Sequence, residues 1–518
     1  MNWFRQSYDG IVLEREGHNT SIVLIGDSVR ETNIAPLGRG FFKRTALLYG
    51  SVFLLSNSML APAKADDRMV LYDAEGLKIR AHFQAGLNAV VERNLFWNFA
   101  DRFAPTADFN PQKQWLEGYI KPGISFSKDF DEYRRLYGKA SFVASGTLGV
   151  DAYDTGNTGE ITLEEAHLGW RQKINNQSTF DVSFGPREYK IGTGMLIANG
   201  GNSGFERGAL KFGPRKAWKS AAIGKLTYDD VDITTFYLQP NELPSSSSNT
   251  QLVGSELRYN WEKGSFAGVT YGHVLHSNSP YPKAAPNGIG VPEIIPDGRD
   301  GLNFINAYAI GKPLPNTFDN LIAGAEFAYE WNDRIDLSAW AGRVYVGYNF
   351  SDLPWSPALA FAYQTFSGDN PDTEKLERFD PLFYEGNPSS WSTGSKSSMV
   401  FINSNVNAFL ASLRVTPTER DAFTLRYSHI RANQLHSPIQ FGQGTRVETN
   451  DGVPNPIAGV SSYHLSDDVF LEYNRTINAN TYLTVGVSAS FPGAGIDSMI
   501  DADAPIWMGG FANVVVNY

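Results

Sequence analysis

Basic side chains recur at alternate positions of a segment that runs from Leu77 to Val90. Lys78, Arg80 and His82 alternate there with apolar residues. Because successive side chains of a strand point to opposite faces, the three basic groups share one face. Such a face attracts anions, and a planar guanidinium binds a carboxylate through two parallel hydrogen bonds. The first chemistry that the sequence indicates is therefore recognition of anions.

Other alternating segments carry basic residues on their polar sides. On this pattern the candidate anion-binding residues are Lys78, Arg80, Arg171, Arg187, Arg258, Arg343, Arg414 and Arg426. Acidic residues such as Glu165, Asp181 and Glu256 lie among them. Two interpretations stay open: the arginines select anionic solutes, or they pair with carboxylates in a ladder that supports the wall.

The sequence offers little for catalysis or for metal binding. No Gly-x-Ser-x-Gly, His-Glu-x-x-His or phosphate-binding loop occurs, and there is no cysteine. Ser428 and His429 are neighbours in an alternating segment, so they point to opposite faces and form no catalytic pair. The acidic stretch 367–374 lacks the spacing of an EF-hand, and we interpret it as a solvated loop. We expect no catalytic residue, no metal and no cofactor.

The alternating segments are long enough to cross a bilayer as tilted strands. The last of them stops on Tyr518, as the final strand of an outer-membrane barrel does when it pairs with the first. The expected strands are 77–90, 115–127, 137–150, 161–173, 178–189, 219–228, 231–239, 251–262, 264–276, 301–311, 321–331, 339–350, 357–366, 405–416, 420–431, 466–477, 481–491 and 508–518. They predict an all-β fold, a transmembrane antiparallel barrel of about 18 strands.

Connection lengths alternate along the chain, which favours this even count. Seven of the nine connections that follow odd-numbered strands are longer than ten residues, as at 190–218, 367–404 and 432–465, and most of the connections between them are tight turns. Phe205 to Phe212 also resembles a strand, and we assign it to a loop in keeping with this alternation. We expect long extracellular loops and short periplasmic turns. Loops 367–404 and 432–465 are long enough to fold over or into the mouth.

The amino-acid composition suits a barrel, and the net charge argues against nucleic acid as a partner. Aromatic residues make up 13% of the 518 residues, and glycine is abundant at 49. The chain has 44 basic and 55 acidic residues, a net charge of −11, which argues against nucleic acid as a partner.

A short apolar run from Thr45 to Leu55 has the surroundings of a secretory signal. Basic residues precede it, and Ala61-Pro62-Ala63-Lys64-Ala65 follows it. We therefore expect a signal peptide over 41–65, cleaved after Ala65, and a barrel over 66–518. Residues 1–40 show no sustained period and form an N-terminal extension, from a start assigned too early or from an extended signal.

The region from 366 to 433 contains several distinctive motifs: Phe-Ser-Gly-Asp-Asn at 366–370, Arg-Phe-Asp-Pro-Leu-Phe-Tyr at 378–384, Pro417, and Arg-Ala-Asn at 431–433. In these motifs the region resembles the alginate export family of outer-membrane proteins. Leu163 to Trp170 leading into Phe184-Gly185-Pro186-Arg187, and the hairpin from Lys225 to Pro240, are also similar to it. The resemblance implies an 18-stranded barrel whose arginine-lined constriction passes an anionic polyuronate outward.

These observations together predict a channel that catalyses no reaction. The expected location is the bacterial outer membrane, reached through the Sec pathway. The expected partners are an anionic polysaccharide or a small anionic solute, outer-membrane lipid, and periplasmic secretion components. Three alternatives stay open: a general or uptake porin for small nutrients such as carbohydrates and organic anions, a barrel lipid hydrolase, and a structural or adhesive barrel.

Overall fold

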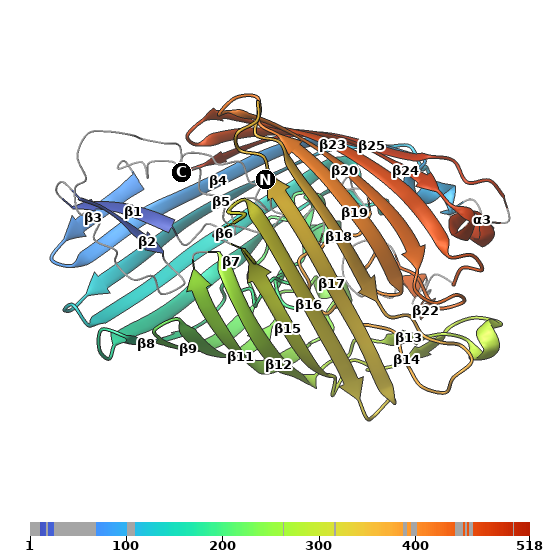
Figure 1. The fold of residues 1–518 in the computed structure, drawn as a ribbon, viewed down its shortest axis with the longest axis horizontal. Coiled ribbons are helices and arrows are strands. Elements are labelled where there is room, and N and C mark those ends of the chain that lie inside the picture. The colour runs from blue at the N-terminus through green and yellow to red at the C-terminus, as the bar shows by residue number, and fades with distance from the viewer. Residues whose placement is uncertain are drawn as a thin grey trace.

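Eighteen antiparallel strands close into one barrel in the computed structural model (Figure 1). Each expected segment forms one of these strands, so the predicted fold class is confirmed. The structure describes residues 11–16, 19–24, 69–100, 109–262, 264–314, 317–386, 391–394, 401–440, 449–450, 453–454, 459–500 and 502–518. The expected signal peptide at 41–65 lies outside these ranges.

The barrel strands follow one another around the ring in sequence order. They are β4 (Leu77–Arg93), β5 (Lys113–Asp129), β6 (Arg134–Val150), β7 (Gly156–Lys173), β8 (Ser178–Phe184), β9 (Ser220–Tyr228), β10 (Val231–Gln239), β11 (Gln251–Glu262), β12 (Ser265–His276), β15 (Asn303–Gly311), β16 (Leu321–Asn332), β17 (Leu337–Asn349), β18 (Ala358–Phe366), β19 (Val406–Val415), β20 (Asp421–Ala432), β23 (His464–Asn478), β24 (Thr481–Pro492) and β25 (Trp507–Asn517).

The remaining elements are short. β3 (Val70–Ala74) forms a hairpin with the first residues of β4. β1 (Ile11–Glu16) pairs with β2 (Asn19–Leu24), a hairpin in the region where the sequence shows no sustained period. The long connections hold β13 (Tyr281–Lys283), β14 (Glu293–Ile295), β21 (Thr449–Asn450), β22 (Val453–Pro454), α3 (Ala494–Ile500) and the 3-10 turns Leu95–Asn98, Phe205–Arg207, Pro244–Ser246 and Pro286–Gly288. In the described ranges no helix has the length and apolar character needed to cross a membrane.

The two faces of the wall differ in the way that the alternation predicts. Leu87, Leu148 and Ile161 face outward and expose 56%, 65% and 74% of their surface. Their neighbours Asn88 and Thr147 face inward and are buried. An apolar outer band with a polar interior is the arrangement that lipid on one side and a lumen on the other require.

The C-terminal strand closes the ring. β25 pairs with β4 from Met508 opposite Arg93 to Asn517 opposite Gln84. Tyr518 continues this pairing, because its backbone N–H and C=O both bond to Phe83 at 2.8 and 3.1 Å. Closure leaves no free backbone edge at this seam, as a strand in contact with lipid requires.

β8 is shorter than the expected segment 178–189, and the reason is local. Gly185 adopts φ +112°, and a Cβ there would lie 2.2 Å from the carbonyl oxygen of Ala166. Pro186 follows and has no N–H to continue the ladder. The chain therefore leaves the wall after Phe184, and the predicted strand residue Arg187 belongs to the following connection.

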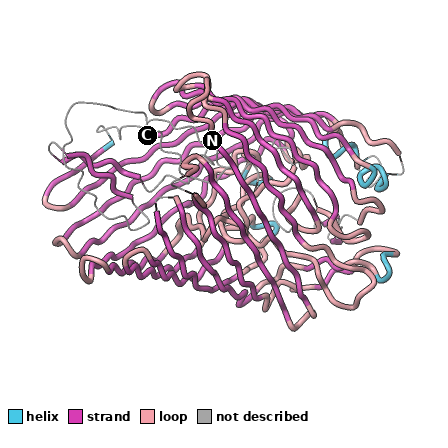
Figure 2. Tube along the Cα trace, in the orientation of Figure 1, coloured by secondary structure: helices cyan, strands magenta, loops and turns pink. Residues whose placement is uncertain are grey.

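Two long connections enter the barrel. The first, residues 185–219, is called the first inserted segment below, and the described part of 367–405 is called the second inserted segment. Figure 2 shows loop segments within the outline of the barrel. Side chains of both segments, including Leu196 and Phe379, are buried in one apolar cluster with inward-facing strand residues such as Phe304. The core of this protein therefore lies inside the barrel.

Candidate functional site

The inner faces of β4 to β7 carry a row of basic groups. The strand register places Arg80 opposite Ser125, Ser125 opposite Lys139, and Lys139 opposite His167. Lys139 forms an ion pair with Glu165 at 2.8 Å. The side chains of Lys139 and Arg80 stay partly exposed. The row thus presents positive charge toward the lumen.

Three more of the predicted residues lie near this row. Lys78 forms an ion pair with Asp73 at 3.4 Å, and Arg171 with Asp181 at 2.7 Å. Arg187 follows β8 and donates to the Ser183 hydroxyl at 2.6 Å. In the part of the chain that the structure describes, Arg80 and Arg187 make no carboxylate contact.

The other predicted residues are dispersed around the wall. Arg258 on β11 donates to Asn260 at 2.8 Å and lies 4.0 Å from the ring centroid of Phe266. Arg414 and Arg426 lie on the adjacent strands β19 and β20.

Arg343, Arg414 and Arg426 face inward, but only 5%, 6% and 7% of their surface is exposed. Arg426 lies 3.5 Å from Glu472, and Arg343 lies 4.5 Å from the ring centroid of Trp391. Substitution of these buried residues would alter packing together with charge. They are therefore poor positions at which to test ion selectivity.

Two buried glutamates of the wall hold the first inserted segment. Glu117 on β5 accepts the backbone N–H groups of Lys211 and Phe212 at 3.1 and 2.7 Å. Glu164 on β7 accepts those of Lys216 and Ala217 at 2.7 and 3.0 Å. These four bonds to carboxylates fix residues 211–217 against β5 and β7, because charged acceptors form the stronger hydrogen bonds.

Two buried arginines add to this attachment. Arg215 donates to the hydroxyls of Thr162 and Ser145 at 2.6 and 2.7 Å. Arg207 donates to the carbonyl groups of Asn241 and Glu242 at 2.9 and 3.0 Å. Both guanidinium groups are thus engaged in holding loops, and neither lies among the residues expected from the sequence.

The first inserted segment also reaches the opposite wall. Glu256 on β11 accepts the N–H of Gly192 at 3.0 Å, and Glu326 on β16 accepts the hydroxyl of Thr193 at 2.5 Å. The segment therefore spans the lumen from β5 and β7 to β11 and β16. Any solute that moves through the barrel has to pass along it.

The two inserted segments are bonded to each other. Phe383 donates its N–H to the carbonyl of Leu196 at 2.9 Å and accepts the N–H of Ala198 at 2.8 Å. Lys190 and Glu385 form an ion pair at 2.9 Å. Backbone bonds and a charge pair together join the segments into one unit inside the barrel.

A buried ion pair fastens the second inserted segment to the connection after β12. Arg299 donates to both carboxylate oxygens of Asp380 at 2.8 and 3.1 Å, and both side chains are at most 4% exposed. The N–H of Asp380 in turn donates to Glu330 on β16 at 2.8 Å.

The acidic stretch 367–374 is only in part the solvated loop that we expected: residues 372–374 are exposed, but Asp369 is buried. Its carboxylate accepts the N–H groups of Ala284 and Glu377 at 2.7 and 2.8 Å. Burial raises the pKa of Asp369 above its ordinary value, and the two backbone bonds oppose that shift. Here the carboxylate joins loops, which its sequence context does not indicate.

Lys216 is buried in the first inserted segment and donates to the side-chain oxygen of Asn199 at 3.1 Å. Burial lowers the pKa of Lys216 to about 7, although Glu385, Glu188 and Glu164 act to raise it. The docked segment therefore favours the neutral amine relative to lysine in water, whose pKa is about 10.4.

Docking of the first inserted segment should accordingly depend on pH. Its stability should be greatest above about pH 10.4 and should fall until the pH reaches the folded pKa near 7. The Lys216→Met protein lacks the titrating amine, so its free energy of unfolding does not carry this pH dependence. It should exceed that of the wild type most at pH 7, and the difference should vanish near pH 10. Denaturant unfolding of both proteins across this range measures it, and a pH-independent difference would contradict this account.

Sequence reasoning missed most of this site. It named 367–404 and 432–465 as loops able to enter the mouth and left out 190–218, which the structure shows crossing the lumen. Of the residues that hold it, Glu117 occupies an ordinary inward position of its strand. Glu164 lies at a β-bulge, where the register shifts between Ser141 and Phe142, and both Glu164 and Glu165 are buried. A usable signal was the doubtful strand Phe205 to Phe212, since an apolar stretch inside a long loop has to be buried somewhere.

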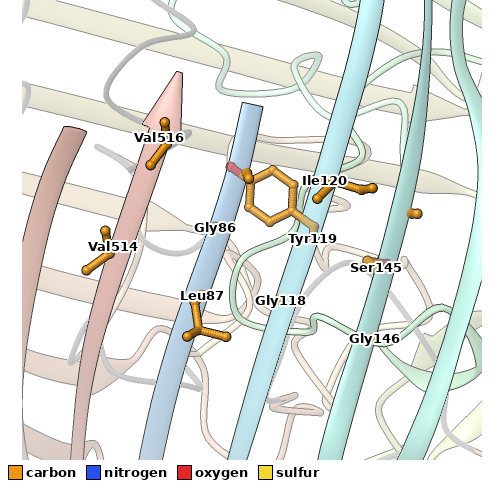
Figure 3. A pocket seen from close by; sticks show the side chains of 11 residues that line it. Gly86, Leu87, Gly118, Tyr119, Ile120, Ser145, Gly146, Val514 and Val516 are labelled. Atoms are coloured by element: carbon orange, nitrogen blue, oxygen red, sulfur yellow. The ribbon is translucent and has the colours of Figure 1, made fainter. Parts of the chain in front are cut away.

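A shallow apolar groove of about 620 Å³ lies where β25, β4, β5 and β6 meet (Figure 3). Outward-facing small residues form its floor, and Leu87, Ile120, Val514 and Val516 flank it. No charged side chain lines it. It belongs to the lipid-facing band, so we do not count it as part of the functional site.

Residues 325–505 match the family model described as alginate export. The matched range contains the region 366–433 on which the resemblance rests, so that resemblance is confirmed there. A search of curated protein sequences finds no match.

Solved outer-membrane proteins are similar in structure. OmpT of Vibrio cholerae aligns over 86% of this chain and 99% of its own, with 10% identity and a TM-score of 0.37. OmpF of Salmonella typhi in complex with daunomycin aligns over 87% of this chain and 100% of its own, with 10% identity and a TM-score of 0.39. OprB of Pseudomonas putida aligns over 85% of this chain and 94% of its own, with 8% identity and a TM-score of 0.41.

Proposed function

We propose that this outer-membrane β-barrel is a channel that passes anionic saccharides, of the polyuronate type, outward through a basic lumen. The observation that carries the proposal is the row of Arg80, Lys139 and His167, with Arg187 close to it. Arg80 and Arg187 supply positive charge that no described carboxylate neutralises. The family match over 325–505 supports the substrate class.

The mechanism is electrostatic and requires no reaction. A carboxylate that leaves bulk water for a narrow lumen loses hydration, and guanidinium groups replace part of it through charge-assisted hydrogen bonds. Weak binding at several positions lets the solute advance from one group to the next. Aromatic rings near the arginines, such as Phe266 beside Arg258, offer faces to sugar rings.

A small-solute porin is the second candidate, and a specific observation favours it. The inserted segments are bonded to both walls and to each other, which leaves limited room for a polymer. In this alternative the same basic groups would select organic anions or small sugars.

Charge reversal tests the proposal. Arg80→Glu with Arg187→Glu should lower the ratio of anion to cation permeability by about tenfold or more, because a pair of unit charges about 4 Å apart in water interacts by about 1 kcal/mol. The reversal potential of single channels under a salt gradient measures this ratio. The matched control is Arg93→Glu with Arg134→Glu, which makes the same change of net charge at an outward-facing position of β4 and at the exposed first residue of β6.

Titration with oligouronates separates the two candidates. Block of the wild-type current, lost in the Arg80 and Arg187 variant but kept in the control, supports a polyuronate channel. Anion selectivity without block supports the small-solute porin. Selectivity that is unchanged by the charge reversal would remove the basic row from the mechanism.

Delivery through the Sec pathway remains a prediction from residues 41–65. N-terminal sequencing of the protein isolated from outer membranes should begin at Asp66. A different mature N-terminus would displace the expected cleavage site.

A further inference from the structure

Three potential metal ligands converge on the outer face of the barrel, where β20 meets β23. The Nδ1 atom of His429 and the Nε2 atom of His464 each lie 2.9 Å from a different carboxylate oxygen of Asp467. One ligand atom from each of the three residues lies within 4.8 Å of the others. Among the described residues this is the one such group of three.

A β-bulge creates this convergence. His429 and Asp467 are directly opposite each other in the strand register, and both face outward. His464 precedes Asp467 by three positions, so a regular strand would place the two on opposite faces. The register shifts between Ile430 and Arg431, Leu465 is buried, and His464 joins the outer face. Bulges often serve to redirect one side chain in this way.

Neighbouring groups hold the three side chains in place. Tyr427 donates its hydroxyl to Asp467 at 2.6 Å, which orients the carboxylate. The two imidazole rings stack with centroids 4.9 Å apart at an angle of 24°. A Cβ at Gly493 would lie 2.5 Å from Nδ1 of His464, so glycine there leaves room for the ring.

We propose that His429, His464 and Asp467 form a binding site for a divalent transition-metal ion of the Zn²⁺ type. Two imidazoles and one carboxylate are a donor set that suits such ions. Ligand atoms around tetrahedral zinc lie about 3.3 Å apart, given bonds of about 2.0–2.1 Å. One ligand atom from each residue lies within 4.8 Å of the others, so metal binding requires these atoms to approach one another by at most about 1.5 Å.

The surroundings leave a coordination position for water or another donor. The side chains of His429, His464 and Asp467 are 33%, 38% and 32% exposed, so solvent reaches them. Arg431, also on the outer face of β20, lies 5.6 Å from the ring centroid of Tyr463. The metal would link β20 to β23 at the loop end of the barrel, across the long connection that separates them in sequence.

Metal binding to the full-length protein without a histidine tag tests the site. After removal of metal by a chelator, calorimetric titration with Zn²⁺ in detergent should show one saturable site. His429→Gln and His464→Gln should each lower its affinity by about 10-fold or more, since each removes a direct ligand. Glutamine keeps a group that can hydrogen-bond to Asp467, so a purely structural role would be largely preserved. Bound Co²⁺ should give a visible spectrum that both variants lose.

His276→Gln is the matched control. His276 also lies near a carboxylate at the loop end, 3.4 Å from Asp300, but without a second histidine. The His276→Gln protein should bind Zn²⁺ with the affinity of the wild type. Absence of a saturable site in the wild type would overturn the proposal. So would unchanged affinity in both variants, with each variant confirmed as a folded barrel by its thermal unfolding in the absence of metal.

Discussion

Replacement of Arg299 by alanine should release the second inserted segment from the connection after β12. The substitution leaves Asp380 buried without its cation, and loss of one partner of a buried ion pair typically costs about 3–5 kcal/mol. The released form should then be populated about 100-fold or more above the wild type. Arg378, which is 1% exposed in the closed arrangement, becomes a trypsin site in the released form. Mass spectrometry of timed digests measures the cleavage rate after Arg378.

Arg334→Ala is the matched control, because Arg334 pairs with Asp300, next to Arg299, on the exposed rim. Its side chain is 54% exposed, and exposed pairs contribute about 0–1 kcal/mol. We therefore expect a cleavage rate after Arg378 within about fivefold of the wild type. Equal rates in both variants would show that the buried pair does not hold the segment. Single-channel conductance should rise in Arg299→Ala alone if the segment restricts the lumen.

Replacement of both Glu117 and Glu164 by alanine should detach the first inserted segment from β5 and β7. Four backbone N–H groups lose their carboxylate acceptors. Hydrogen bonds to charged groups contribute about 1.5–3 kcal/mol each, and such losses do not simply add, so we expect several kcal/mol in total. Trypsin should then cleave after Lys211, Arg215 and Lys216, all of which are protected by the docked arrangement.

Glu472→Gln is the control for this pair of substitutions. Glu472 is a buried, inward-facing glutamate whose described bonds run to Asn474 and Arg426 of the wall. It should leave the three trypsin sites protected. Cleavage at these sites in the control would point to a general loosening of the barrel. Protection in the Glu117 and Glu164 variant would mean that Arg215 and the apolar contacts suffice to hold the segment.

These two experiments also bear on transport, because they release the inserted segments separately. A rise in conductance after release of the first inserted segment alone would place the narrow point in residues 185–219. A rise only after release of the second inserted segment would place it in that segment.

The barrel itself follows from the sequence. Apolar and polar residues alternate from Leu77 to Val90, and the same local pattern of period two recurs along the chain. Every strand needs this pattern because one face of the wall contacts lipid and the other faces the lumen. Chain closure through Tyr518 follows from the same requirement, since an unpaired edge in lipid is costly. For this reason the strand count and the alternation of long loops with short turns were predicted correctly.

The functional site depends on contacts between residues far apart in sequence, and the alternation of side chains along a strand does not indicate them. Whether Arg343 faces water or packs against Trp391 is set by a loop that lies far away in sequence. Glu117 has the pattern of any inward strand residue, and only the docked segment gives it the role of an anchor. Arg187 leaves the wall because Gly185 turns the chain, and a bulge brings His464 to the face of Asp467. The sequence alone determined the wall, through local alternation imposed by the membrane, whereas tertiary contacts between distant loops decided what occupies the lumen and which charges remain accessible.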